Sequence, residues 1–221
     1  HPVRGRGAAE GPSGHEGVGS EDNGDDVTKW VWPLPGAERV FPDEPGRYGA
    51  VRRFDTHSGV DIYCELSQPV VAVEAGVVIG IETFTGPNSR PRETPWWNET
   101  FAILVRGASG VVVYGEVQPY VQVGDVVGQS WLLGSVEKPV LKSFKGRPMV
   151  MLHLELLDSS ATETVRWPSD LLADPTPQLR AAEESGVTFR LEDYKGLRFR
   201  DPSAESKDSR WWAVWGSERS T

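Results

Sequence analysis

The chain has 221 residues, a formal net charge of −9 and a pI near 5.0. This length allows one domain with tails or two small domains. The acidic balance argues against a nucleic-acid partner, because phosphate binding needs a basic surface. The sequence has no apolar run of about 18 residues or more, so we expect no membrane span. Cys64 is the only cysteine, which excludes an intrachain disulfide, and we expect a small buried thiol.

The first part of the chain differs in composition from the remainder. Residues 1–28 are acidic and rich in Gly, with few apolar side chains, and cannot bury enough surface to offset the entropy of ordering. We therefore expect a disordered tail there. The fold should begin in the Trp-rich stretch 30–36 and form a β domain over residues 29–180, followed by a C-terminal extension over 181–221.

Strand signals dominate the middle of the chain. Runs rich in β-branched residues alternate with glycine, and the Gly-Ala-Ser-Gly stretch 107–110 predicts a hairpin turn. Helix signals are sparse, with one candidate at 179–184. The sequence therefore predicts a mainly β fold: a compact antiparallel β-sandwich or half-open barrel with few short helices. The expected strands cover residues 70–73, 76–82, 101–106, 111–114, 126–129 and 150–157.

Two aromatic clusters have alternative interpretations. The stretch 85–100 resembles an inserted loop and carries Trp96 and Trp97, which either stack on a sugar or peptide ligand or pin the loop to the body. A second cluster, Trp-Trp-Ala-Val-Trp at 211–215, either packs back on the domain or docks a partner.

The residue types best suited to chemistry are His57, Asp61 and His153. Two imidazoles and a carboxylate suit a divalent transition metal, most often zinc, and three protein ligands leave a fourth position open. Positions four apart on a straight strand lie about 13 Å from each other, which is too far for two ligands of one metal. We therefore expect a bend at Ser58 and Gly59 that folds the histidine back over the carboxylate.

Strand alternation places further candidates near these ligands. In the strand 150–157, His153 and Glu155 share the face opposite the core, where Glu155 either supports a ligand or is solvated. In the strand that starts at residue 111, Tyr114 and Glu116 should share a face. Glu116 is a candidate general base, and Tyr114 is a candidate hydrogen-bond donor.

Seven short stretches of the chain follow a known pattern in the same order. They are Trp-Pro-Leu-Pro at 32–35, His-Ser-Gly-Val-Asp at 57–61, 69–78, Val-Tyr-Gly at 113–115, 121–129, Leu-His-Leu-Glu at 152–155 and Asp-Pro-Thr-Pro at 174–177. Taken together, these stretches resemble the M23 zinc metallopeptidases of bacterial cell walls, the lysostaphin and LytM type. The resemblance implies a compact, mostly antiparallel β domain with a groove across the sheet, one zinc ion held by His57, Asp61 and His153, and an extracytoplasmic or secreted location.

Two departures from the family pattern concern catalysis. Where the family usually carries two helper histidines, this chain has Glu116 and Met151. Losing a positioned acid or base typically lowers a rate about 10²- to 10⁴-fold, and losing an oxyanion stabiliser about 10²- to 10³-fold. Met151 supplies neither a proton nor a charge. Glu116 could serve as a base, but an ionised carboxylate cannot stabilise a developing negative charge.

These residues lead to three functional hypotheses. The favoured one is a catalytically impaired zinc-binding domain that binds a cell-wall peptide, a glycan or a protein partner. The alternative is an active zinc endopeptidase that cuts peptidoglycan cross-links with Glu116 as general base. A degenerate amidase activator of the LytM type is disfavoured, because those members generally lack the metal ligands that this chain keeps.

Overall fold

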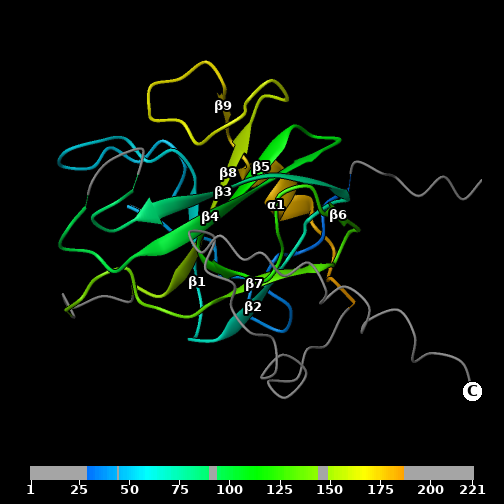
Figure 1. Cartoon of the computed structure of the whole chain (residues 1–221), viewed down its shortest axis with the longest axis horizontal. Coiled ribbons are helices and arrows are strands. Elements are labelled where there is room, and N and C mark those ends of the chain that lie inside the picture. Colours follow the sequence, from blue (N-terminus) through cyan, green and yellow to red (C-terminus); the bar gives the residue numbers. More distant parts are fainter. Residues whose placement is uncertain (1–28, 44, 90–93, 144–148, 187–221) are drawn as a thin grey trace, which may run out of the picture.

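The computed structural model describes residues 29–43, 45–89, 94–143 and 149–186 (Figure 1). The tail expected over 1–28 and the Trp cluster at 211–215 lie outside these described residues. Within them, the chain is mostly antiparallel β-structure with one short α-helix, α1 (Thr176–Ala181). None of the helices in the described part is long and apolar enough to cross a membrane.

The main sheet is open and has the strand order β1-β8-β5-β4-β3-β6 (Figure 1). A short ribbon of β2 and β7 joins this sheet through β5. The strand β9 pairs with the C-terminal end of β8. The strands are β1 (Val60–Tyr63), β2 (Gln68–Val71), β3 (Gly76–Thr85), β4 (Thr100–Gly107), β5 (Val111–Pro119), β6 (Val126–Val127), β7 (Leu132–Val136), β8 (Met151–Leu157) and β9 (Leu172–Ala173). The predicted mainly β, antiparallel and unclosed fold is thus confirmed.

Most strands lie where the β-branched runs predicted them, and the hairpin between β4 and β5 turns at residues 107–110, where Gly107 N–H donates to Gly110 C=O. The expected helix at 179–184 is misplaced by about one turn. Pro177 suits the first turn of a helix, since it needs no N–H partner there. Ala182 leaves the helical conformation with ψ of 140°, so the helix ends earlier than expected.

Apolar side chains cover both faces of the sheet. The larger core contains Trp30, Trp32 and Leu34 from the segment before β1. A smaller cluster lies on the opposite face and includes Val113 and Leu157. In β8, the even positions 152, 154 and 156 belong to the larger core, as alternation predicted. The opposite face therefore carries both the smaller cluster and His153.

A bulge interrupts the alternation in β5. Phe101 of β4 pairs with Val117, and the next residue, Ala102, pairs with Gly115, so Glu116 is an extra residue without a partner position. Its φ of 67° is unusual for a side chain with a Cβ. Tyr114 remains in the larger core. The prediction that Tyr114 and Glu116 share one face by simple alternation is therefore wrong.

Candidate metal centre

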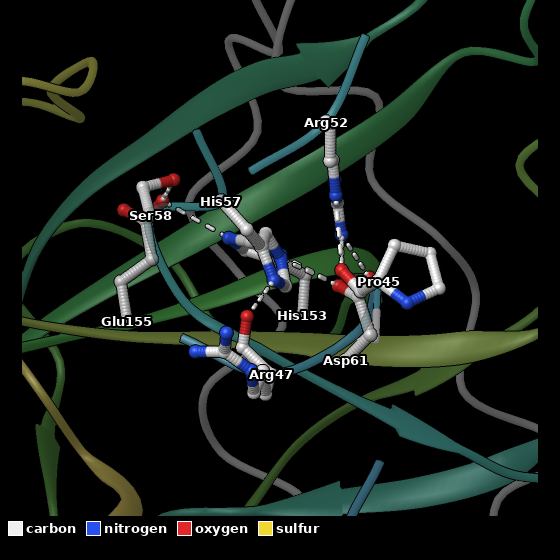
Figure 2. Close-up of polar contacts among 8 residues, drawn as sticks. All are labelled: Pro45, Arg47, Arg52, His57, Ser58, Asp61, His153 and Glu155. Carbon is white, nitrogen blue, oxygen red and sulfur yellow. Dashed lines mark hydrogen bonds and ion pairs between the residues drawn. The ribbon is translucent and has the colours of Figure 1, made fainter. Parts of the chain in front are cut away.

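The side chains of His57, Asp61 and His153 converge on the face of β8 that is opposite the larger core (Figure 2). Asp61 Oδ1 lies 3.0 Å from His57 Nε2 and 2.9 Å from His153 Nδ1. The two ring nitrogens are 3.0 Å apart. All three side chains are buried. The structure therefore brings together the three residues that sequence reasoning singled out as metal ligands.

Local backbone structure explains how they meet. Asp61 and His153 are directly paired across β1 and β8, so their side chains leave the sheet on the same face. His57 lies before β1, in a turn fixed by hydrogen bonds between its backbone and Gly49 and Ala50. The chain then bends at Ser58 and Gly59 before β1 begins at Val60, as expected from the ligand spacing.

The atoms of the cluster that face away from its centre have their own partners. His57 Nδ1 donates to the carbonyl of Arg47 at 2.9 Å, which leaves Nε2 free of that proton. Asp61 Oδ2 accepts from Arg52 Nη2 at 2.6 Å, and Arg52 is itself fixed by two hydrogen bonds to the carbonyl of Pro45. Figure 2 shows Arg52 and Pro45 on one side of the cluster and Glu155 with Ser58 on the other.

The three groups have strongly shifted pKa values. Burial alone would raise the pKa of Asp61, but hydrogen bonds from His153 and His57 hold it below its usual range. Burial is also the main reason why the pKa of His57 is lowered. Burial alone would lower the pKa of His153, but its hydrogen bonds with Asp61 and Glu155 raise this pKa to about 10. In the metal-free cluster His153 is therefore an imidazolium, with one proton on each ring nitrogen, and it lies between the ionised carboxylate of Asp61 and the neutral imidazole of His57.

This donor set fits a zinc ion. The ligand atoms of His57, Asp61 and His153 all lie within 4.8 Å of one another, as one tetrahedral ion with bonds near 2 Å requires. Two nitrogens and one oxygen are typical of catalytic rather than purely structural zinc sites, because a fourth position remains for water or another ligand. Zinc bound there would act as a Lewis acid and lower the pKa of a bound water.

Glu116 lies near the cluster without joining it. Among the described residues, the ligand group within 4.8 Å contains His57, Asp61 and His153 but not Glu116. Its Oε2 is buried and has no hydrogen-bond partner among the described residues. Burial, and then the negative charge of Asp61, raise the pKa of Glu116 to about 8. In the metal-free protein this carboxyl is therefore mostly protonated at neutral pH and is a poor general base.

The structure places Tyr114 away from the cluster. Its ring is fully buried in the larger core, and its hydroxyl accepts a 2.8 Å hydrogen bond from the backbone N–H of Val73. Burial raises its pKa above the usual range. Met151, on the same face of β8 as His153, is also buried, and it pairs with Tyr63. Neither residue offers a polar atom to the cluster.

The loop that follows β3 holds the two tryptophans proposed as ligand contacts. Trp96 is 60% exposed, whereas Trp97 is half-buried and forms a β-bridge with Leu141. Asn98 also attaches the loop to this neighbouring segment. Its backbone N–H donates to the carbonyl of Val140, and its side-chain amide donates to the carbonyl of Pro139. Trp97 therefore helps to pin the loop to this segment, whereas the ring of Trp96 is exposed to solvent.

Two residues at the site were missed by sequence reasoning. Arg52 pairs with Asp61, and the ring of Phe84 packs against His153 with 5.2 Å between ring centroids. Phe84 also lies directly over Gly115, where an added Cβ would come within 2.7 Å of its ring. Nothing in the sequence spacing marks either residue, because both contacts depend on the path of a loop or on tertiary packing.

No protein-family model matches the chain, and no curated protein sequence does. Solved structures do. One is cbpa from L. salivarius REN, with 19% identity, 69% of this chain and 95% of that chain covered, and a TM-score of 0.47. Another is the antimicrobial peptidase lysostaphin from Staphylococcus simulans, with 18% identity, 69% and 56% coverage and a TM-score of 0.43. A third is a zinc-containing peptidase from Vibrio cholerae, with 20% identity, 57% and 36% coverage and a TM-score of 0.38.

Further similar structures are described as a peptidase M23 from Pseudomonas aeruginosa and a glycyl-glycine endopeptidase LytM from Ruminococcus gnavus, with 20% and 16% identity and TM-scores of 0.34 and 0.38. These names are those of the family that the sequence motifs resemble. The chain spans about half of the lysostaphin chain and about a third of the Vibrio cholerae chain.

Proposed function

We propose that this protein is a zinc-binding domain of the M23 type that acts as a binding module for a cell-wall peptide, a glycan or a protein partner, with little or no peptidase activity. The observation that carries the proposal is the contrast within one site. The three ligands His57, Asp61 and His153 converge, whereas the two positions where the family carries helper histidines hold a buried Met151 and a Glu116 that makes no hydrogen bond to the ligands.

Physical chemistry supports a module over an efficient enzyme. A general base needs to lie within hydrogen-bond reach of the water that it activates and to be ionised at the working pH. The carboxyl of Glu116 is not part of the group of ligand atoms that lie within 4.8 Å of one another, and in the metal-free protein burial and Asp61 raise its pKa to about 8. Met151 has no group that could stabilise an oxyanion. The metal would still bind and polarise a ligand carbonyl or carboxylate, which suits recognition.

The experiment is to incubate the zinc-loaded protein with purified peptidoglycan and with pentaglycine. The proposal expects the protein to sediment with peptidoglycan and to release no peptide fragments. The variant His57→Ala should lose the zinc and with it the retention. Absence of retention by the zinc-loaded protein would contradict the cell-wall form of the proposal and leave a soluble protein partner as the ligand.

The second candidate is an active endopeptidase, favoured by the convergent ligands and the buried carboxyl of Glu116. It expects fragments from the same incubation, and their loss in Glu116→Ala. That result would replace the module by the enzyme. Trp96 is proposed as a ligand contact in either case, because its ring is exposed on the loop after β3. Trp96→Ala should then weaken retention while zinc content stays the same. An extracytoplasmic or secreted location is part of the same proposal.

A further inference from the structure

We infer that Glu155 is a positioning residue for the metal centre: it binds the Nε2 proton of His153 and so makes Nδ1 the nitrogen that faces the metal. This deepens the proposed function, because it rests on zinc binding at this site but not on what the domain recognises. It also assigns roles to Ser58 and Gly59, which lie within the segment 57–61, the first motif, but are not among the candidate ligands.

The two ring nitrogens of His153 have different surroundings. Nε2 lies 3.0 Å from Glu155 Oε1, while Nδ1 lies 2.9 Å from Asp61 Oδ1. A neutral imidazole carries one proton, and the nitrogen without the proton is the metal ligand. Because an ionised carboxylate can only accept, Nε2 must donate to Glu155. A metal at the cluster then meets Nδ1, whose own proton it displaces.

Ser58 holds Glu155 in place. Its hydroxyl donates to Glu155 Oε1 at 2.5 Å, so the oxygen that binds His153 also binds the first motif. Glu155 is only 1% exposed, and its Oε2 is buried without a hydrogen-bond partner among the described residues. Burying a carboxylate with one oxygen unpaired costs stability, which a purely structural position on β8 would not require.

Gly59 provides the space for this contact. A Cβ at residue 59 would lie 2.4 Å from the carbonyl oxygen of Leu154, 2.8 Å from His153 Nε2 and 3.0 Å from Glu155 Cγ. Any larger residue would push the first motif away from β8 and separate Ser58 from Glu155. The Ser-Gly pair between His57 and Asp61 therefore serves the second histidine as well as the bend.

The two histidines are oriented by partners of different strength. His57 donates from Nδ1 to a neutral backbone carbonyl, that of Arg47, whereas His153 donates from Nε2 to a carboxylate. An anionic acceptor makes the imidazole a more basic ligand and fixes its orientation more tightly. Loss of such a partner typically lowers metal affinity about 10- to 100-fold. His153 should thus depend on its outer partner more than His57 does.

The test measures zinc affinity by competition with a chromophoric chelator for three variants of the full chain. Glu155→Gln replaces the anionic acceptor by a neutral one of equal size and should weaken binding about 10- to 100-fold. Ser58→Ala leaves the carboxylate but loosens it and should give a smaller loss. Glu65→Gln removes the same charge from an exposed position shortly after β1 and should bind zinc as the wild type does. Equal affinities for Glu155→Gln and Glu65→Gln would overturn the inference.

A spectroscopic readout separates positioning from a general effect on the fold. NMR of isotope-labelled, cadmium-loaded wild type should show metal coupling to Nδ1 of His153 and to Nε2 of His57. Coupling to Nε2 of His153 instead would contradict the inference even if affinities changed. If Glu155→Gln does not fold, Ser58→Ala still tests the claim, because it keeps the buried charge. A wild type that binds no zinc would contradict the proposed function itself, whereas normal binding with unchanged variants would contradict only the role of Glu155.

Discussion

Asp61 Oδ1 and His153 Nδ1 lie 2.9 Å apart, directly across the antiparallel pair of β1 and β8. This pairing brings together two ligands that are separated by 92 positions in the chain, and it requires no loop to adopt a special path. Two paired strands of the sheet therefore supply two of the three candidate ligands. His57 joins them from a turn that also involves Arg52 and Arg47.

Removal of the metal should lower the thermal stability of the domain. A ligand that binds only the folded state stabilises it by about 2.7 kcal/mol when present at 100 times its Kd. For a domain of this size that corresponds to a shift of about 5 to 10 °C. The measurement is thermal melting of zinc-loaded protein with and without a chelator. As a control, His57→Ala should melt at the same temperature in both conditions, and a chelator effect in that variant would point to a different metal site.

The substitution Tyr114→Phe tests whether this side chain serves the fold or the site. The hydroxyl is the acceptor for the buried N–H of Val73, and its removal leaves that N–H unsatisfied. We expect a loss of about 1–3 kcal/mol in the free energy of unfolding, measured by urea denaturation, with zinc affinity unchanged. A large fall in zinc affinity with unchanged stability would show that Tyr114 acts at the metal centre after all.

Glu116 should make the stability of the metal-free protein depend on pH. Its pKa in the folded state is about 8, mainly because of burial, against an ordinary value of 4.5. Between these values the folded state holds a proton that the unfolded state releases. The contribution of the Glu116 carboxyl to stability is therefore fully present below pH 4.5 and is lost as the pH rises towards 8.

The measurement is urea unfolding of chelator-treated wild type and Glu116→Gln across this pH range. The wild type should lose stability with rising pH relative to the variant, which has no proton to release. Parallel curves for the two proteins would show that the carboxyl of Glu116 is ionised in the fold. Such a result would favour the enzyme over the binding module.

Cys64 should react slowly in the folded protein. Burial, and then the negative charge of Glu116, raise its pKa from 9.0 to about 12. Only the thiolate attacks an alkylating reagent, so a shift of about three units lowers the reactive fraction about 1000-fold near pH 8. Iodoacetamide labelling followed by mass spectrometry should be fast in denaturant and at least about 100-fold slower in buffer. The side chain of Cys64 is half-buried rather than fully buried as expected from the sequence, and equal rates in both conditions would contradict its raised pKa.

Sequence reasoning predicted the parts of the structure that depend on local pattern. The β-branched runs marked six of the strands, and alternation along β8 placed His153 and Glu155 opposite the larger core. Ligand chemistry required a bend at Ser58 and Gly59, and the chain bends there. The strands β1, β7 and the two-residue β9 were missed. Residues 60–63 follow the bend directly, and β7 contains Gly134, which weakens a strand signal.

Tertiary effects account for the errors at the site. A one-residue bulge with positive φ removed Glu116 from the alternation that should have placed it beside Tyr114. The Arg52 guanidinium reaches Asp61 from a turn nine positions upstream, and no periodic pattern encodes that contact. Tyr114, which was expected to donate a hydrogen bond at the site, is instead part of the larger core. Its buried hydroxyl is satisfied by a backbone N–H and needs no ligand.

The most direct test of a metal held by His57, Asp61 and His153 is the zinc content of protein purified without added metal, measured by mass spectrometry for the wild type and for Asp61→Asn. We predict one zinc ion per chain in the wild type and a strongly reduced content in the variant. Wild-type protein without zinc, or an equal content in both proteins, would contradict the account.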